Sequence, residues 1–148
     1  LDEIKISKSM RLLMKKNKYE ITYNRAFSEV VKSCAQVKRF GQSGTWITPG
    51  LMNVYNILHE QGHAHSVEIW DGTKLVGGLY GIDIGDIFCG ESMFSKASNS
   101  SKMALIYLSK ELKKNNYKFI DCQVPTAHLA SLGAKTISRN DFLKYLEK

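Results

Sequence analysis

The 148-residue chain lacks several features that would place it in other protein classes. It has no apolar run near the roughly 18 residues that a transmembrane helix needs, and its first residues do not resemble a signal peptide. It has only two prolines, and hydrophobic residues make up 43%, which is typical of an ordinary globular chain. Its three cysteines are far apart and form no C-x-x-C pair, so we expect buried thiols in a reducing compartment; they are Cys34, Cys89 and Cys122. We therefore expect one cytoplasmic domain without an internal linker.

Acidic residues are scarce in the first part of the chain. Residues 1–40 hold ten Lys/Arg and four Asp/Glu, whereas residues 41–148 hold eleven and ten, so nearly all of the net charge of +7 comes from the first forty residues. Such a field favours a polyanionic partner, with nucleic acid the first candidate. Plain solubility explains the same composition equally well at this point.

Apolar periodicity and turn residues predict a mixed order of helices and strands. The chain order is a helix at 10–16, a strand at 19–23, a helix capped by Asn24, a polar loop at 38–44, a helix from Pro49 to Gly62, strands at 66–70, 74–79 and 87–94, a helix at 100–114, a strand at 119–124, a short helix at 128–132, a strand at 135–137 and a helix at 140–146. The helix from Pro49 to Gly62 should bury Leu51, Val54, Tyr55 and Leu58. The helix at 100–114 should bury Leu105, Leu108 and Leu112. This order resembles the GCN5-related N-acyltransferase fold, which implies an α/β (α+β) domain with a mixed central sheet flanked by helices.

The expected strand at 119–124 holds the first candidate site. Side chains alternate along a strand, so Asp121 and Gln123 should share one face. Polar groups in an otherwise apolar strand are costly unless something satisfies them. The pair is therefore either a satisfied structural contact or a catalytic pair at the open end of a sheet, where α/β proteins usually place their sites.

Two further features could contribute to a site. Gly90 can bend its strand and direct Glu91 into a cleft, although an exposed edge glutamate is the alternative. Trp46 and Tyr55 lie near the start of the same helix and could form a stacking platform for an adenine. Core packing is the alternative for both aromatics, and it fits Tyr55 better than Trp46.

The segment from His59 to His63 matches the H-E-x-x-H pattern of zinc peptidases. That chemistry needs both histidines on one face of a continuing helix. Here Gly62 lies inside the pattern and should end the helix, so we expect no metal site.

Glycine is missing where coenzyme A-dependent enzymes of this fold need it. Those enzymes carry a loop of the form [RQ]-x-x-G-x-[GA] before the long helix, and its backbone N–H groups bind pyrophosphate. The corresponding residues 95–102 of this chain read SKASNSSK. Coenzyme A is therefore not an expected cofactor.

Several motifs together resemble the bacterial leucyl/phenylalanyl-tRNA–protein transferases over nearly the whole chain. They are GTWIT at 44–48, HEQGHAHS at 59–66, LVGGLYG at 75–81, FCGESMFS at 88–95, IDCQ at 120–123 and ASLGA at 130–134. The resemblance implies transfer of Leu or Phe from aminoacyl-tRNA to the N-terminal Arg or Lys of acceptor proteins, which marks them for N-end-rule degradation. It also implies that neither a cofactor nor zinc is needed. Nothing here matches the family's smaller N-terminal domain, so we expect residues 1–148 to be a single, monomeric catalytic domain.

The resemblance also suggests roles for the candidate residues. Gln123 would accept a hydrogen bond from the attacking amine, Asp121 would orient Gln123 and favour proton loss, and Glu91 matches the family's cleft glutamate. Selection of Leu or Phe needs an apolar pocket, for which we expect Leu79, Phe88, Met93 and Leu105. The alternatives are a coenzyme A-dependent N-acetyltransferase and a tRNA-binding domain without catalysis.

Overall fold

A computed structural model describes residues 1–37 and 44–147 of the chain. The loop predicted at 38–44 therefore lies, except for Gly44, outside the described residues. The helices are α1 Lys8–Lys15, α2 Phe27–Gln36, α3 Pro49–Glu60, α4 Ser100–Lys114, α5 Ala127–Ser131 and α6 Arg139–Leu146. The strands are β1 Glu20–Tyr23, β2 Ala64–Asp71, β3 Lys74–Ile84, β4 Ile87–Ser95 and β5 Phe119–Asp121.

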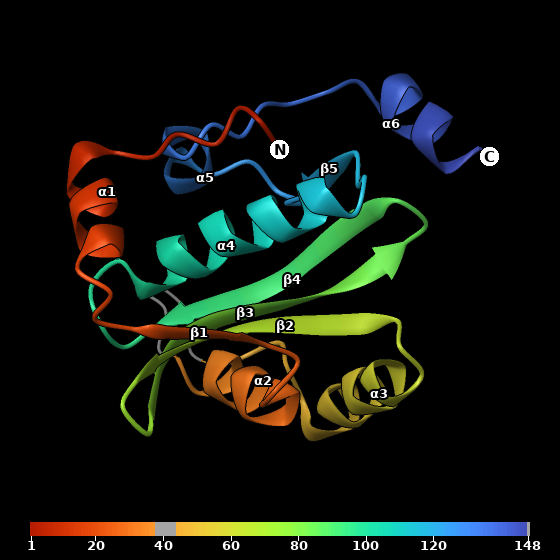
Figure 1. The fold of residues 1–148 in the computed structure, drawn as a ribbon. Coiled ribbons are helices and arrows are strands. Elements are labelled where there is room, and N and C mark those ends of the chain that lie inside the picture. The colour runs from red at the N-terminus through yellow and green to blue at the C-terminus, as the bar shows by residue number, and fades with distance from the viewer. Residues whose placement is uncertain (38–43, 148) are drawn as a thin grey trace.

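The five strands form one mixed sheet in the order β1-β2-β3-β4-β5. The first four are antiparallel neighbours, and β5 joins β4 in parallel. A parallel neighbour needs a crossover, and α4 supplies it by running back over the sheet (Figure 1). The predicted mixed sheet flanked by helices is confirmed.

Helices cover both faces of the sheet and divide the core in two. Figure 1 shows α4 with α1 and α5 on one face and α2 with α3 on the other. The cluster on the α4 face contains Met10, Val67, Ile69, Leu79, Phe88, Met103, Ala104, Leu105, Ile106, Leu108, Leu112 and Leu132. The cluster on the other face contains Phe27, Val30, Val31, Cys34, Ile47, Tyr55, Ala64, Tyr80 and Phe94. The predicted burial of three leucines on the inner face of α4 is confirmed for Leu105, Leu108 and Leu112.

The start of α3 follows its sequence signal, but its apolar stripe is narrower than predicted. Thr48 caps the helix by accepting a hydrogen bond from Leu51 N–H at 3.2 Å, and Pro49 takes the first position. Gly62 follows the helix with φ +81°, as its stop signal predicts. Val54 was predicted to be buried, yet 49% of it is exposed. The helix packs against α2 and β2 through the side that carries Tyr55, so Val54 faces solvent.

The start of α2 differs from the prediction that Asn24 caps it. Asn24 adopts φ +57°, and its side-chain oxygen accepts Ser66 N–H at 3.0 Å. The buried carboxylate of Glu68 instead accepts the N–H groups of Arg25 and Ala26, both at 3.4 Å. A negative charge at a helix N-terminus is stabilised by the free N–H groups there, so a distant strand residue replaces the local cap.

The strand predicted at 135–137 is absent; these described residues form an irregular connection. Figure 1 shows this segment on the outer side of the α4 layer, away from the sheet, so no strand lies beside it to complete a ladder. The N-terminal segment contacts the start of this connection and the residues just before it. Lys135 forms an ion pair with Glu3 at 2.8 Å, and Leu132 O accepts Lys5 N–H at 2.9 Å.

Candidate active site

The candidate site lies where β4 bulges and β5 ends. In the β3–β4 ladder, Tyr80 pairs with Ser92 and the next pair is Gly81 with Gly90. Glu91 is therefore the extra residue of a β-bulge, a feature that redirects a side chain. A Cβ at Gly90 would lie 3.6 Å from the carbonyl oxygen of Asp121, an ordinary contact, so the register shift beside Gly90 and not crowding redirects the strand. The bend predicted at Gly90 is confirmed.

The strand predicted at 119–124 is shorter than expected. Pairing of β5 with β4 stops at Asp121, opposite Cys89. The Asp121 carboxylate accepts Gln123 N–H at 2.8 Å, a turn that side chains of this type favour, and Gln123 adopts φ +65°. Since Pro125 cannot donate a ladder hydrogen bond, the strand could not have continued far. Asp121 and Gln123 are thus joined by a turn, whereas the shared strand face was predicted wrongly.

A chain of hydrogen bonds joins the bulge to this turn. The side-chain amide of Gln123 donates to Glu91 Oε1 and to Gly90 O, both at 3.2 Å. The hydroxyl of Tyr55 donates to Glu91 Oε2 at 2.8 Å. Because two acceptors hold the NH₂ group of Gln123, its amide oxygen points elsewhere, and no described protein group donates to that oxygen. These hydrogen bonds therefore orient the Gln123 amide oxygen as an acceptor beside the Asp121 carboxylate.

Burial keeps the flanking groups of this network protonated. Desolvation is the main cause that raises the pKa of Tyr55 far above its usual value, and the adjacent Glu91 raises it further, so its hydroxyl remains a donor. Desolvation also raises the pKa of Cys89 to about 11 and raises that of Cys122. Both thiols are therefore protonated at neutral pH and are poor nucleophiles. Cys34 and Cys89 are buried as predicted, while Cys122 is only half-buried.

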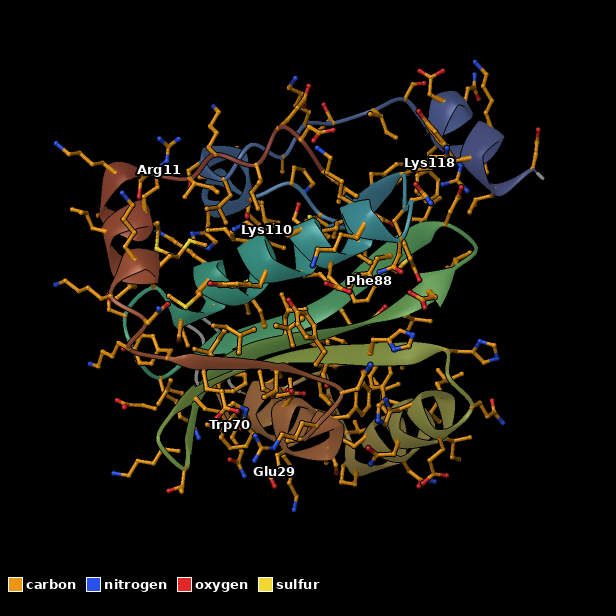
Figure 2. All side chains as sticks on the ribbon, in the orientation of Figure 1. Arg11, Glu29, Trp70, Phe88, Lys110 and Lys118 are labelled. Carbon is orange, nitrogen blue, oxygen red and sulfur yellow. The ribbon has the colours of Figure 1, made fainter. Side chains whose placement is uncertain are left out.

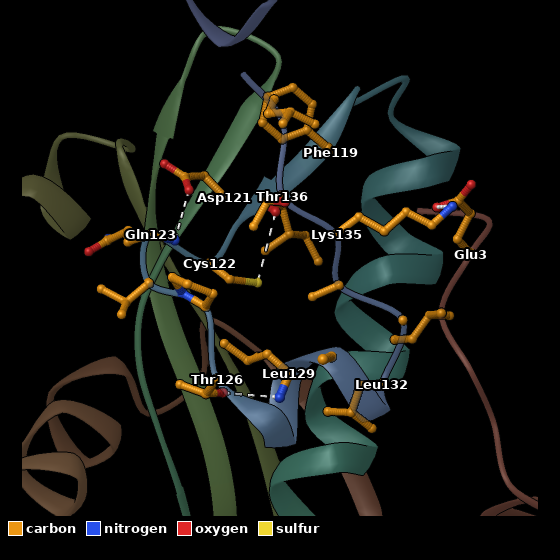
Figure 3. Close-up of a pocket in the computed structure, with 18 of the residues that line it drawn as sticks. Glu3, Phe119, Asp121, Cys122, Gln123, Thr126, Leu129, Leu132, Lys135 and Thr136 are labelled. Atoms are coloured by element: carbon orange, nitrogen blue, oxygen red, sulfur yellow. Dashed lines mark hydrogen bonds and ion pairs between the residues drawn. The ribbon is translucent and has the colours of Figure 1, made fainter. Parts of the chain in front are cut away.

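A cleft of about 1090 Å³ opens beside the turn. Its walls come from the N-terminal segment, β5, α5 and α6, and Figure 3 shows Asp121, Gln123 and Phe119 along it. Leu105 is the only predicted pocket residue among the described residues that line this cleft. The other three belong to the core on the α4 face, where Leu79 and Phe88 are buried and Met93 packs against them. Their assignment as a pocket stays a prediction.

The two predicted aromatic residues, Trp46 and Tyr55, differ in how far they are exposed to solvent. Trp46 is 44% exposed and free to stack on a ligand, whereas Tyr55 is 5% exposed and packs edge-on against Tyr80, with ring centroids 5.0 Å apart. Tyr55 therefore belongs to the core and reaches the site only through its hydroxyl. Sequence reasoning missed its bond to Glu91, because nothing in the local pattern connects α3 with the bulge in β4.

The two histidines of the H-E-x-x-H pattern, His59 and His63, have different surroundings. The His59 ring stacks on Phe27 at 4.2 Å and its Nδ1 contacts Ala64 O at 2.8 Å, while His63 is exposed beyond the helix end. The described parts of the chain contain no group of three or more His, Cys, Asp and Glu arranged to hold a metal ion. They also contain no helix long and apolar enough to cross a membrane.

Solved structures of acetyltransferases share the fold. A ribosomal-protein-alanine N-acetyltransferase from Brucella melitensis biovar Abortus 2308 matches with a TM-score of 0.59 and 12% identity, over 82% of this chain and 95% of that one. An aminoglycoside acetyltransferase from an uncultured soil metagenomic sample matches with a TM-score of 0.58 and 12% identity, over 90% of each chain. The predicted GCN5-related N-acyltransferase-like fold is confirmed, and identities this low show the fold alone.

Comparison of the sequences is more specific. A protein described as leucyl/phenylalanyl-tRNA–protein transferase from Flavobacterium johnsoniae is 55% identical over 99% of this chain and 69% of its own length. One with the same description from Flavobacterium psychrophilum is 54% identical over 99% of this chain and 70% of its own length. The family model described as leucyl/phenylalanyl-tRNA protein transferase matches residues 1–147. The chain therefore belongs to the leucyl/phenylalanyl-tRNA protein transferase family, a family of transferase enzymes.

Proposed function

We propose that this chain transfers Leu or Phe from aminoacyl-tRNA to the N-terminal Arg or Lys of an acceptor protein, which marks the acceptor for degradation. The observation that carries this proposal is the hydrogen-bonded Tyr55–Glu91–Gln123 chain, anchored by Asp121 and open to the cleft. A cytoplasmic location and a monomeric state are part of the proposal.

The reaction forms a peptide bond and breaks an ester bond. The lone pair of the acceptor's α-amine attacks the ester carbonyl carbon, the bond to the ribose oxygen of tRNA breaks, and that oxygen takes up the proton that the nitrogen loses. The Gln123 amide oxygen accepts a hydrogen bond from the attacking N–H and so directs the lone pair. The second carboxylate oxygen of Asp121 stays available to favour proton loss, because only Oδ1 is used by Gln123 N–H.

Positioning should contribute more than base strength to this reaction. An α-amine has a pKa of about 8, so keeping it neutral at pH 7 costs only about 1.4 kcal/mol. Holding two substrates in reactive geometry can lower the barrier by about 7–11 kcal/mol. The fixed amide of Gln123 fits this requirement, since Glu91 and Gly90 O prevent it from rotating.

The surface of α1 supports tRNA as the donor. Residues 4–19 contain six basic residues and no Asp or Glu; the basic residues are Lys5, Lys8, Arg11, Lys15, Lys16 and Lys18. All six side chains are exposed, and no described carboxylate forms an ion pair with them. Phosphate contacts of this kind supply much of the affinity for nucleic acids. Exposed Trp46 would stack on the terminal adenine of the tRNA. Of the four predicted pocket residues, Leu105 lines the cleft and would contact the aminoacyl side chain, with Leu79, Phe88 and Met93 in the core behind it.

The start of α4 argues against the alternative, a coenzyme A-dependent acetyltransferase. Pyrophosphate would need free N–H groups in the first turn of this helix. Here Ser101 N–H donates to Ser95 Oγ at 3.3 Å, and Ser100 N–H donates to Ala97 O at 3.2 Å. The Ser100 hydroxyl also bonds Val76 O at 2.8 Å, which ties the helix start to β3. These N–H groups already have partners within the chain.

The decisive test is transfer of labelled Leu from charged tRNA to a peptide beginning with Arg. We expect Asp121→Asn and Gln123→Ala each to lower the transfer rate about 100-fold, the scale of losing one oriented group in a reactive site. Affinity for tRNA should stay nearly unchanged. Residues that act as a unit are not additive, so the double variant should be little worse than the worse single variant.

Three controls make the test specific. Gln61→Ala, an exposed glutamine at the end of α3, should keep full activity. Transfer to a peptide beginning with Ala should be absent in all variants. Full activity in both Asp121→Asn and Gln123→Ala would contradict the assigned roles, and binding of tRNA without transfer by the unaltered chain would support the alternative of a tRNA-binding domain.

A further inference from the structure

A second basic feature lies on the sheet face opposite α1. A pocket of about 500 Å³ opens between α2, the start of β3 and the turn after β4. Three lysines from these three elements line it, namely Lys32, Lys74 and Lys96, together with Glu29. No local sequence pattern groups these residues, because they come from three separate elements of the chain.

Backbone contacts bring two of the lysines together. Val76 O accepts Lys96 N–H at 2.7 Å and Ala97 N–H at 3.1 Å, which fixes the turn after β4 against β3 close to Lys74. The Lys96 ammonium lies over the Phe94 ring, 5.8 Å from its centroid. The position of this charge therefore depends on regular structure beneath it and not on a long exposed loop.

The charges of the pocket are not neutralised by the chain. Lys32, Lys74 and Lys96 are exposed, and among the described residues none of them forms an ion pair within 4.0 Å. Glu29 is the only acidic group among the described lining residues, so together with the three lysines these residues carry a net charge of +2. Ser33 and Gln36 add polar side chains, while Leu75 and Val76 provide an apolar floor.

We infer that this pocket binds a backbone phosphate of the tRNA, at a point remote from the 3′ end. Three ammonium groups around one concave site favour a negatively charged group such as a phosphodiester, and lysine acts as a point-charge donor to phosphate. Figure 1 shows the turn before α4, the β2–β3 hairpin and α1 at the same end of the sheet. A nucleic acid bound along α1 could thus reach the pocket around this end. The inference rests on the proposed function, because it assumes that the polyanion is the tRNA substrate.

Equilibrium binding of uncharged tRNA tests the pocket without requiring transfer. The variant Lys32→Ala/Lys74→Ala/Lys96→Ala should weaken binding about tenfold near 0.1 M salt. It should also reduce the slope of log affinity against log salt by about one, the change expected for one lost phosphate contact. Glu29→Gln should have the opposite effect and tighten binding, which a folding defect could not mimic.

Two matched variants calibrate this result. Lys118→Ala removes an exposed lysine on the other side of the sheet from Glu29 (Figure 2) and should change neither affinity nor slope. Lys15→Ala/Lys16→Ala/Lys18→Ala removes three charges at the end of α1 and sets the scale for the phosphate contacts proposed there. Single-turnover transfer from aminoacyl-adenosine, which lacks the tRNA body, should be the same in the pocket variant and the unaltered chain.

An unchanged salt slope in the triple pocket variant would overturn the inference. A titration with inorganic phosphate, followed through the backbone amide NMR signals of α2, tests whether the pocket binds a free small anion instead. Saturation by phosphate with no effect of the variants on tRNA would mean a small-anion site and would also overturn the inference. If the unaltered chain binds tRNA through this pocket but transfers no amino acid, the result would contradict the proposed function and leave the inference about the pocket intact.

Discussion

Two glutamates of the sheet, Glu68 in β2 and Glu91 in β4, are held in opposite ways. Glu68 in β2 is 0% exposed, and its carboxylate accepts the hydroxyls of Thr22 and Ser66, both at 2.5 Å, in addition to the N–H groups of Arg25 and Ala26. Every donor comes from the protein itself. A carboxylate has about four acceptor positions, so Glu68 has no capacity left for a ligand.

Glu91 in β4 has a similar charge but lies half-buried at a bulge, with one donor on each oxygen. Glu91 is not among the described residues that line the cleft beside β5, and it is connected to that cleft through Gln123. The comparison shows how the same side chain serves as an internal helix cap in one strand and as part of a candidate active site in another. The number of donors supplied by the chain and the distance from solvent separate the two roles.

The largest effect should come from Glu68→Ala. This change leaves the hydroxyls of Thr22 and Ser66 and the N–H groups of Arg25 and Ala26 without their acceptor. We therefore expect a loss of about 3–5 kcal/mol in the free energy of unfolding. Denaturant unfolding measures it, and Glu60→Ala, at the exposed end of α3, should cost far less. Activity per folded molecule should not change. A loss below about 1 kcal/mol would show that the buried carboxylate is not a structural cap.

A smaller effect should come from Tyr55→Phe, which removes one of the two donors to Glu91 and retains the ring. We expect transfer to fall about tenfold, equivalent to about 1.4 kcal/mol, because Glu91 then holds Gln123 less firmly. Tyr23→Phe is the matched control, since it removes a tyrosine hydroxyl that donates to Tyr107 O at 3.4 Å and does not touch Glu91. Equal losses in both variants would mean that packing, and not the bond to Glu91, controls the rate.

The smallest effect concerns pH. Transfer should rise by at most about tenfold between pH 7 and 9 as the acceptor amine, with a pKa of about 8, loses its proton. The rate should not fall again before pH 10, because burial raises the pKa of Tyr55 and keeps its hydroxyl a donor. A pH–rate profile corrected for spontaneous ester hydrolysis measures this. A descending limb that disappears in Tyr55→Phe would contradict the raised pKa.

Local chemistry explains what the sequence predicted well. Thr48 and Pro49 define a helix start through the groups of two adjacent residues, and Gly90 permits a bend wherever its strand lies. The spacing of the leucines in α4 places them on one face whatever the partner. Such features depend on neighbours within a few residues, so a pattern is sufficient to find them.

Predictions failed where a distant element supplied the partner. Asn24 matched a helix cap, but Glu68 from β2 occupies that role. The segment 119–124 matched a strand, but the Asp121 side chain captured the N–H of Gln123 and ended it. Val54 fitted the apolar stripe of α3, yet α3 rests on the sheet through a narrower face.

The sequence by itself determined the mixed fold class, the family resemblance and the identity of the polar groups at the site, because these follow from residue types and their order. Only the tertiary structure decided that Tyr55 donates to Glu91, that Gln123 is held by the bulge, and that three lysines from separate elements surround one pocket. The physical reason is that hydrogen bonds and charge clusters act over a few ångströms in space. Packing against the sheet brings such groups together, and a local sequence pattern does not predict which of them come into contact.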